Sequence, residues 1–154
     1  MNIKLINGRE SVPVENQQLS ALSDFYKGFN TRDLSRVKNN WLNSGHVSMF
    51  NPLGGIKRGW EEIEGVYRRI FQGNANVYVE FYDFEFYETG DMCIYSGREK
   101  GFVTVGSERL DLAIRTSRTF IKNGVNWRQV HHHGSIEDAQ ILSRYQMLVA
   151  SAHK

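Results

Sequence analysis

The sequence predicts one α+β domain with a cone shape, in which about three N-terminal helices pack inside a strongly curved, mostly antiparallel sheet and a helix follows at the C-terminus. Helical spacing of apolar residues dominates the first half, whereas β-branched and aromatic residues dominate residues 77–135. Segregation of helices from antiparallel strands is typical of α+β domains, and long twisted strands curl around the helices that cover them. A chain of 154 residues, 40% of them hydrophobic, can bury one substantial core.

The N-terminal half predicts an arm and two helices. Residues 1–13 show no clear period and end at Pro13, so we expect a flexible arm or an edge strand before a main domain spanning residues 14–136. Apolar residues at intervals of three and four predict a helix over residues 14–29. They are Leu19, Leu22, Phe25, Tyr26 and Phe29. After a break with capping residues, the spacing restarts at Leu34 and predicts a second helix as far as Leu42.

The middle of the chain predicts a short strand, a turn and a third helix. Residues 46–50 are a strand candidate, and the following Asn-Pro-Leu-Gly-Gly of residues 51–55 has strong turn chemistry. Beyond Gly59, residues 60–71 have helical spacing, with glutamates in the first turn where the helix dipole favours them.

The second half predicts four strands and a closing helix. The strands are expected at residues 77–88, 92–105, 109–122 and 126–135. Glycine-containing turns at residues 88–91 and 123–124 join the first two and the last two as hairpins. Helical spacing returns after residue 136 and predicts a C-terminal helix within residues 137–154.

Composition excludes several classes of partner. The 19 basic and 17 acidic residues are interspersed and give a net charge of +2, without the basic tract that grips a phosphate backbone, so we expect no nucleic-acid partner. No segment reaches the roughly 20 apolar residues of a membrane span. The single Cys93 cannot form an internal disulfide, and the N-terminus lacks the apolar run of a signal peptide. We therefore expect a cytoplasmic protein.

Several motifs together resemble the nuclear transport factor 2-like (SnoaL-like) superfamily over residues 17–136. The motifs are Phe-Tyr...Phe-Asn...Asp at 25–33, Phe-Asn-Pro-Leu-Gly at 50–54, Gly-Trp-Glu-Glu-Ile at 59–63 and Trp-Arg-Gln-Val-His-His-His-Gly-Ser at 127–135. The second half most resembles the association domain of calcium/calmodulin-dependent protein kinase II, through Cys-Ile...Arg at 93–98, Thr-Ser-Arg-Thr-Phe at 116–120 and the histidine motif. The resemblance implies a cone of helices in a curved sheet that is dimeric or larger.

In the kinase family the matching arginines line a deep pocket for small carboxylates, so the resemblance implies the same role for Arg98 and Arg118. A guanidinium suits this role because its fixed fork of donors matches a carboxylate. The alternative is that each arginine pairs with an internal acid. Candidate acids are Glu80, Glu85 and Asp111.

Ketosteroid isomerases, which belong to the same superfamily, depend on groups that this chain lacks at the matching positions. Their general base is an aspartate in an Asp-Pro-x-Gly turn, and here that position is Asn51, which cannot accept the proton. Their oxyanion-holding tyrosine matches Phe25, and the region around residues 115–116 offers no carboxylic acid as the second donor. We therefore expect no isomerisation by that mechanism, although Tyr26 or Tyr67 could supply a hydroxyl by another route.

The triple histidine supports three alternatives. His131 and His133 share one face of the predicted strand, about 6.6 Å apart, and His132 takes the other face. The pair could ligate a metal, but no third ligand is close in sequence and we predict no metal site. His131 or His133 could act as a catalytic acid or base, or the histidines could be structural. Val130 and Trp127 are apolar on opposite faces, so the pattern does not decide which face meets the helices.

The predicted function is binding of a small anionic or carbonyl ligand, with a carboxylate as one candidate. The candidate ligand-binding residues are Arg98, Arg118, Asn51, Tyr26 and Trp41. Asn51 could contact a ligand or cap its own turn, and Trp41 could equally belong to the core. No Gly-rich phosphate loop or dinucleotide fingerprint occurs, so we predict no cofactor.

Two other function classes stay open. The first is a cofactor-free lyase, isomerase or cyclase in which His131 or His133 is the acid or base. The second is an oligomerisation module. The low-charge aromatic strand at residues 78–87 places apolar groups on both faces, which predicts a homodimer through the outer face of the sheet.

Overall fold

The computed structural model describes residues 2–152, and this range contains four helices and one seven-stranded sheet. The helices are α1 (Gln17–Asn30), α2 (Leu34–Asn40), α3 (Trp60–Gln72) and α4 (Ala139–Ser151). The strands are β1 (Leu5–Ile6), β2 (Ser48–Phe50), β3 (Ile56–Arg58), β4 (Asn76–Thr89), β5 (Met92–Val105), β6 (Glu108–Asn123) and β7 (Asn126–Ser135).

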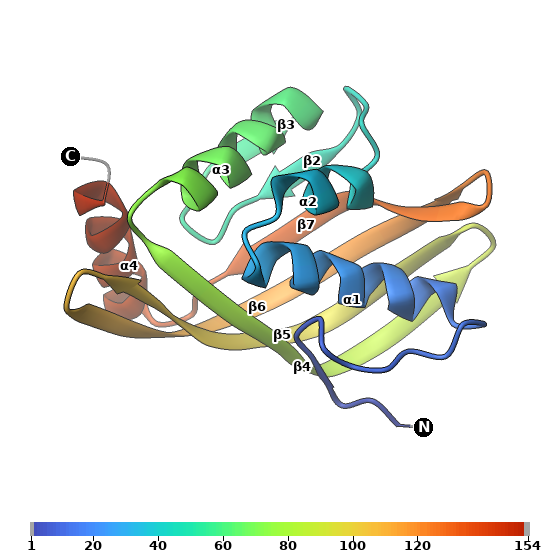
Figure 1. Cartoon of the computed structure of the whole chain (residues 1–154), viewed down its shortest axis with the longest axis horizontal. Coiled ribbons are helices and arrows are strands. Elements are labelled where there is room, and N and C mark those ends of the chain that lie inside the picture. The colour runs from blue at the N-terminus through green and yellow to red at the C-terminus, as the bar shows by residue number, and fades with distance from the viewer. Residues whose placement is uncertain (1, 153–154) are drawn as a thin grey trace.

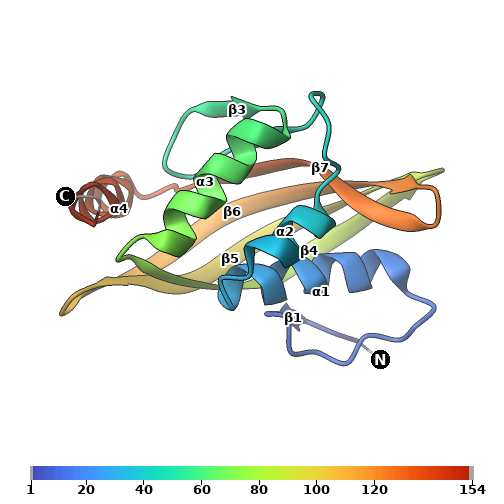
Figure 2. The ribbon, with the colours of Figure 1, turned by 45° about the horizontal axis from the view of Figure 1, so that its top comes forward.

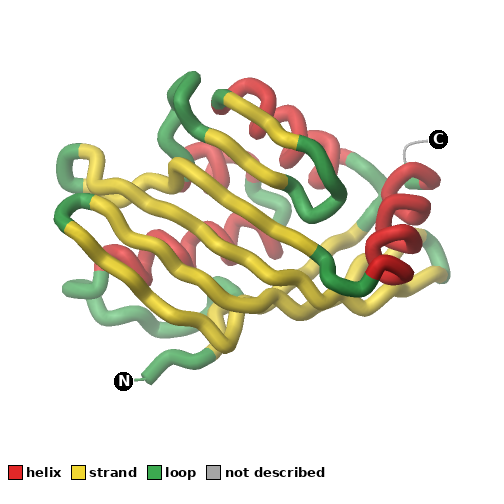
Figure 3. Tube along the Cα trace, turned by 180° about the vertical axis from the view of Figure 1, so that it is seen from behind, coloured by secondary structure: helices red, strands yellow, loops and turns green. Residues whose placement is uncertain are grey.

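The sheet has the strand order β1-β4-β5-β6-β7-β2-β3, and only the β2–β7 pairing is parallel. Figures 1 and 2 show α1, α2 and α3 on one face of the curved sheet and α4 across one end. Seen from behind, the outer face of the long strands carries no helix (Figure 3). The predicted α+β cone is confirmed. Part of the N-terminal arm is an edge strand, β1, and the short β3 is an addition to the prediction.

Side-chain caps set the helix boundaries. Helix α1 begins three residues later than predicted because Asn16 is its cap and accepts a hydrogen bond from the Leu19 amide at 3.1 Å. Asp33 caps α2 in the same way through the Arg36 amide, and Asp138 caps α4 through two amides. Helix α3 has no side-chain cap, but Gly59 turns the chain at φ 80°.

Two apolar clusters form the core. The larger lies between α1 to α3 and the sheet and includes fully buried Phe25, Phe81 and Phe120. The smaller lies under α4, where Tyr145 and Leu148 pack with buried residues of β5 and β6. Those strand residues are Val103, Leu110, Leu112 and Ile114. Helix α4 thus covers the part of the sheet that the other helices leave open (Figure 1).

Two irregularities in strand pairing reverse the in-out alternation. In β4 the register shifts between Tyr82 and Glu85, where Asp83 has φ 50° and Gly97 of β5 leaves room for Phe84. In the β6–β7 pair, Thr119 faces His131 and Phe120 faces Gln129, which leaves one residue of β7 unmatched. Trp127 and His132 therefore both point inward, although strict alternation would separate them.

Among residues 2–152, no helix combines the length and apolar character needed to cross a membrane.

Candidate functional site

A cavity of about 50 Å³ lies inside the cone, between the helices and the concave face of the sheet. Most of its wall is apolar, with side chains from α1, α3, α4 and the strands. Six polar residues interrupt that wall: Asn51, Tyr67, Glu99, Arg118, His132 and Tyr145. A few polar groups in an otherwise apolar cavity are typical of small-molecule sites.

Arg118 and Glu99 form an ion pair in this wall. Arg118 stands on β6 and Glu99 on β5, and their side chains are each 4% exposed. A terminal guanidinium nitrogen of Arg118 donates to Glu99 Oε1 at 3.1 Å. Burial alone would lower the pKa of Arg118, but the neighbouring Tyr26 and Glu99 raise it above its ordinary value. The arginine is therefore charged, and Glu99 offsets its charge.

Further hydrogen bonds hold the pair in place. The Tyr26 hydroxyl on α1 donates to Glu99 Oε1 at 2.6 Å, and Arg118 Nε donates to the same hydroxyl at 3.2 Å. Arg118 also donates to Gln129 Oε1 at 2.8 Å, and Gln129 in turn donates to Asn40 on α2. The guanidinium carbon lies 3.7 Å from the centre of the Phe25 ring. These contacts join the sheet to α1 and α2 and fix the guanidinium.

His132 is the third polar group in this part of the wall. It faces Arg118 directly across the β6–β7 pairing and is 4% exposed. Burial, reinforced by the positive charge of Arg118, lowers the pKa of His132 well below 6.5, so the imidazole is neutral at neutral pH. Its Nδ1 lies 3.4 Å from the carbonyl oxygen of Ser117. With the proton assigned to Nδ1, Nε2 is a free acceptor beside Gly134 and Pro52.

Two tyrosines complete the polar part of the wall. Tyr67 comes from α3 and Tyr145 from α4, and both side chains are buried. Burial raises the pKa of both phenols, and the nearby Glu99 raises the pKa of Tyr145 further. Both hydroxyls therefore keep their protons and can donate hydrogen bonds to a molecule in the cavity.

Two of the predicted ligand-binding residues, Arg118 and Asn51, line the cavity. Asn51 also caps its turn, because its Oδ1 accepts from the Leu53 amide at 2.8 Å. Phe25, which occupies the position of the isomerase tyrosine, lines the cavity as well. The resemblance therefore selected three positions that line one cavity.

Tyr26 and Trp41 lie behind the cavity wall. The Tyr26 hydroxyl is engaged by Glu99 and Arg118. Trp41 is 1% exposed and packs against Trp60 and Tyr67, at 6.3 and 6.5 Å between ring centres. Among the residues described, its indole nitrogen has no hydrogen-bond partner. The geometry gives Tyr26 a positioning role and Trp41 a place in the core.

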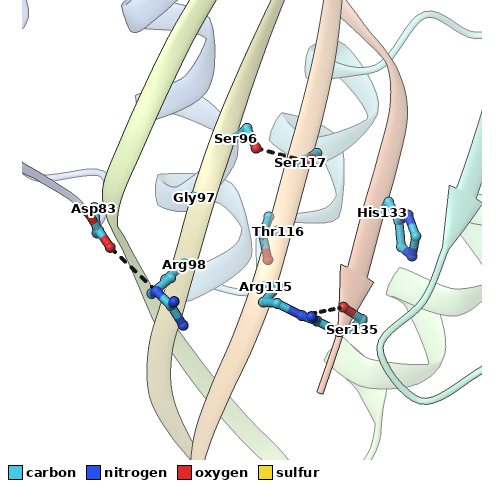
Figure 4. A pocket seen from close by; sticks show the side chains of 9 residues that line it. All are labelled: Asp83, Ser96, Gly97, Arg98, Arg115, Thr116, Ser117, His133 and Ser135. Atoms are coloured by element: carbon cyan, nitrogen blue, oxygen red, sulfur yellow. Dashed lines mark hydrogen bonds and ion pairs between the residues drawn. The ribbon is translucent and has the colours of Figure 1, made fainter. Parts of the chain in front are cut away.

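Arg98 lies on the opposite face of the sheet from Arg118, so the expected pocket between the two arginines does not form. Arg98 Nε lies 3.4 Å from Asp83, at one side of an open groove of about 340 Å³ (Figure 4). Across the groove Arg115 donates to Ser135 at 3.2 Å. Adjacent residues of a strand point to opposite faces, and Glu99 takes the inward position that the prediction gave to Arg98.

His131 and His133 also lie outside the cavity, which corrects the expectation that they work in the pocket. Both rings pack against Phe50 in β2, with ring centres 4.9 and 5.1 Å away. His131 Nδ1 lies 2.8 Å from Ser48 Oγ, and His133 borders the outer groove (Figure 4). These contacts agree with the structural alternative, in which the histidines bind a neighbouring strand.

Sequence reasoning missed Glu99 as the partner of Arg118 and left the side of His132 undecided. The acids proposed as partners were Glu80, Glu85 and Asp111, whereas the structure pairs the two predicted arginines with Glu99 and Asp83. The sequence did contain a signal for Glu99. Glu99 lies an even number of residues from the apolar Cys93 and Tyr95, so alternation places all three on the same face of the strand. No group of three His, Cys, Asp or Glu suited to a metal occurs within residues 2–152.

Comparison with known proteins shows which domain family and which solved structures this chain is similar to. The family model for the SnoaL-like domain matches residues 19–139. No curated protein matches the chain. A solved Thiobacillus denitrificans structure, described as a candidate association domain of calcium/calmodulin-dependent protein kinase type II, is 25% identical with a TM-score of 0.64. It covers 82% of this chain and 100% of its own.

Two further solved structures share the fold. One, from Streptomyces avermitilis, is described as a candidate dehydratase of the NTF2-like family; it is 22% identical, covers 80% of this chain and 96% of its own, and has a TM-score of 0.71. The other is an NTF2-like superfamily protein from Salmonella enterica; it is 18% identical, covers 80% of this chain and 91% of its own, and has a TM-score of 0.70. Because the family model spans most of the sequence, the chain belongs to the SnoaL-like domain family.

Proposed function

We propose that the protein binds a small uncharged molecule with a carbonyl or hydroxyl group in the cavity inside the cone. The observation that carries this proposal is the buried polar group formed by Glu99, Arg118 and His132 in a mainly apolar wall. A buried ion pair is weak evidence for stability, because desolvation offsets most of its attraction. Hydrogen bonding to the polar end of a ligand would explain why the ion pair is buried in this wall.

The charges favour a neutral ligand over the carboxylate implied by the kinase resemblance. Glu99 already offsets the charge of Arg118, and His132 is neutral. A carboxylate would approach Glu99 and gain no unpaired cation, whereas a carbonyl oxygen can accept a hydrogen bond from Tyr67. Arg98, which is outside the cavity, cannot contribute its charge.

Acetone and propionate test this proposal, with binding followed by the ¹H–¹⁵N resonances of Arg118 Nε–H and Gly134. Acetone has four heavy atoms, so its affinity should be no tighter than about 40 μM. We expect acetone to bind saturably and propionate to bind more weakly. Tyr67→Phe should weaken acetone binding roughly fivefold through loss of one hydrogen bond.

The matched control is Tyr82→Phe, because Tyr82 is half-buried and lies beside Arg98 and Lys100 on the outer face. It should leave acetone binding unchanged. Tighter binding of propionate than of acetone would contradict the neutral-ligand proposal, and binding unaffected by Tyr67→Phe would place the ligand elsewhere.

A second candidate function is proton abstraction next to a carbonyl group, with His132 as the base. The specific observation is a neutral imidazole whose Nε2 can accept a proton in a cavity that also holds phenol donors. The dehydratase description of the Streptomyces avermitilis protein is consistent with such chemistry in this family.

Deuterium exchange tests this function. In D₂O the protein should accelerate deuterium incorporation into the methyl groups of acetone, measured by ¹H NMR, and His132→Gln should remove the acceleration. Equal rates with the wild-type protein and His132→Gln would exclude His132 as the base. His133→Gln, on the outer face, should behave as wild type.

A further inference from the structure

Helix α4 closes the open end of the cone but lies almost entirely beyond the family domain. The SnoaL-like model ends at residue 139, where α4 begins. Figures 1 and 2 show the helix across the end of the sheet, away from α1 and α2. Its apolar side packs on β5 and β6 in the smaller core cluster. A helix appended to the family domain therefore forms part of the cavity wall in this chain.

One residue of α4, Tyr145, reaches the cavity. It is 5% exposed and lies in the wall together with Ile114 of β6 and Leu53 of the turn after β2. The next buried residue of the helix, Leu148, packs only in the smaller cluster. The Tyr145 ring thus separates the cavity from the apolar cluster under α4.

Because the cavity is small, the Tyr145 side chain limits the size of the molecule that can enter. A cavity of about 150 Å³ accepts benzene, whereas the space inside this cone is about 50 Å³. A ligand with a ring fits only if part of the wall moves or is removed. Tyr145 is the side chain that α4 contributes to the wall.

Few polar contacts hold α4 in its place. Gln146 Nε2 donates to the Leu53 carbonyl at 2.9 Å, and Asn74 Nδ2 lies 3.5 Å from the Ala152 carbonyl oxygen. Both are side-chain to backbone contacts near the surface. The rest of the attachment is apolar packing, which allows a helix to shift without breaking a hydrogen-bond ladder.

We propose that α4 is a closing element added to the SnoaL-like domain and that Tyr145 determines the largest molecule that the cavity accepts. The proposal rests on the proposed function in that it concerns the same cavity. It differs in relying on the volume and the attachment of α4, and not on the polar group of Glu99, Arg118 and His132.

Fluorobenzene is a suitable probe because it is apolar, has a ring and is observed directly by ¹⁹F NMR. We expect Tyr145→Ala to bind fluorobenzene at least about tenfold more tightly than the wild-type protein, because the cavity gains the volume of the ring. Met147→Ala is the matched control, since Met147 lies on the same helix and is 67% exposed. It should bind as the wild type does.

A folded Tyr145→Ala variant, verified by its ¹H–¹⁵N spectrum, that binds fluorobenzene no better than Met147→Ala would overturn the proposal. Hydrogen exchange of the wild-type protein gives a second test that needs no substitution. The α4 amides should exchange through local opening, faster than the central amides of β6. Exchange of α4 only by global unfolding would overturn the closing role.

The two proposals can fail separately. If fluorobenzene enters Tyr145→Ala while acetone does not bind the wild-type protein, α4 keeps its closing role and the proposed function falls. If acetone binds but Tyr145→Ala does not widen the range of accepted probes, only the proposal about α4 falls.

Discussion

Arg118 brings a positive charge into the interior of the cone, and Glu99 is the partner that makes this tolerable. The two side chains are 4% exposed, so water screens neither charge. Burial lowers the pKa of His132, and the same guanidinium lowers it further from across the strand pairing, so the imidazole is neutral. At the residue scale, one arginine therefore reinforces the neutral state of its neighbour and, together with Glu99, sets the charge balance of the cavity.

Removing Glu99 should reveal the cost of this buried charge. Glu99→Gln keeps the shape of the side chain but leaves Arg118 without its counter-ion, and we expect a loss of roughly 3 kcal/mol in the free energy of unfolding. Urea denaturation measures the change. Asp83→Asn, which breaks the exposed Arg98 pair, should cost no more than about 1 kcal/mol. Equal losses in the two variants would argue against a special role for the buried pair.

Acid should destabilise the protein through His132. Its pKa is lowered in the folded state, so between that pKa and 6.5 the unfolded chain binds more protons. Stability is therefore full above about pH 6.5 and declines below it, by up to about 1.4 kcal/mol per pH unit for one histidine. Burial also lowers the pKa of His131, which adds to the decline.

Urea midpoints between pH 5 and pH 7.5 measure this slope. His132→Gln should reduce the slope and leave the smaller part that belongs to His131. A variant with the same slope as the wild-type protein would show that His132 does not titrate differently in the folded and unfolded states.

The alternation of side chains along a strand predicts which face of the sheet each residue points to. This prediction failed where the strand pairing is irregular. Arg118 could be selected because a motif resemblance pointed to it, and it lines the cavity. The side of His132 could not be derived, because the irregularity next to Gln129 depends on how β6 pairs with β7. The choice of Arg98 over Glu99 followed the motif resemblance, although alternation from Cys93 and Tyr95 would have placed Glu99 on the inward face.

At the scale of elements, the bulge in β4 bends the sheet and requires a glycine in the strand beside it. A Cβ on Gly97 would lie 2.6 Å from Phe84 Cβ and 2.8 Å from its Cα, which is closer than packed atoms allow. In α3, by contrast, a Cβ on Gly65 would meet nothing within 4 Å. The same substitution should therefore have opposite effects in the two elements.

Gly97→Ala should destabilise the protein by about 1–3 kcal/mol, because Phe84 and its backbone must move. Gly65→Ala should stabilise it by about 0.5–1 kcal/mol, since alanine is the better helix former. Thermal and urea unfolding of the two variants measure whether each substitution raises or lowers the free energy of unfolding. An unchanged free energy of unfolding in Gly97→Ala would mean that the β4 bulge can rearrange at little cost.

The helices were predicted to within a few residues, because their apolar spacing is clear and their caps are local. The short strands were harder. Residues 56–58 form β3 through pairing with β2, and nothing in their own sequence resembles a half-buried strand. Such a strand forms because it can pair with the free edge of the neighbouring strand. The residues of the segment itself do not indicate this pairing.

At the scale of the whole molecule, the sheet separates an enclosed side from an open one. The inner side carries the cavity, and the outer side carries the groove of Figure 4 and an apolar patch near the β4–β5 turn. The patch consists of Tyr87, Met92, Ile94 and Ile121, which are cross-strand neighbours. Tyr87 is 58% exposed and Met92 41% exposed.

This patch carries the prediction of a homodimer through the outer face. Exposed apolar groups on an uncovered sheet face are stabilised by a partner, and a second copy offers the same patch. Light scattering at micromolar concentration should give twice the monomer mass, and Met92→Glu should shift the mass toward the monomer. Met147→Glu, on α4, should not. A monomeric wild-type protein would contradict the prediction.

The sheet that separates these two sides is a single layer, and this has a consequence for how the protein can change. Along β6 the even-numbered residues from Leu110 to Phe120 point inward and the odd-numbered residues point outward. Substitutions at alternate positions of one strand can therefore alter the interior or the outer surface separately. Natural variation or protein design could exchange the ligand of such a domain while its assembly stays the same, or the reverse.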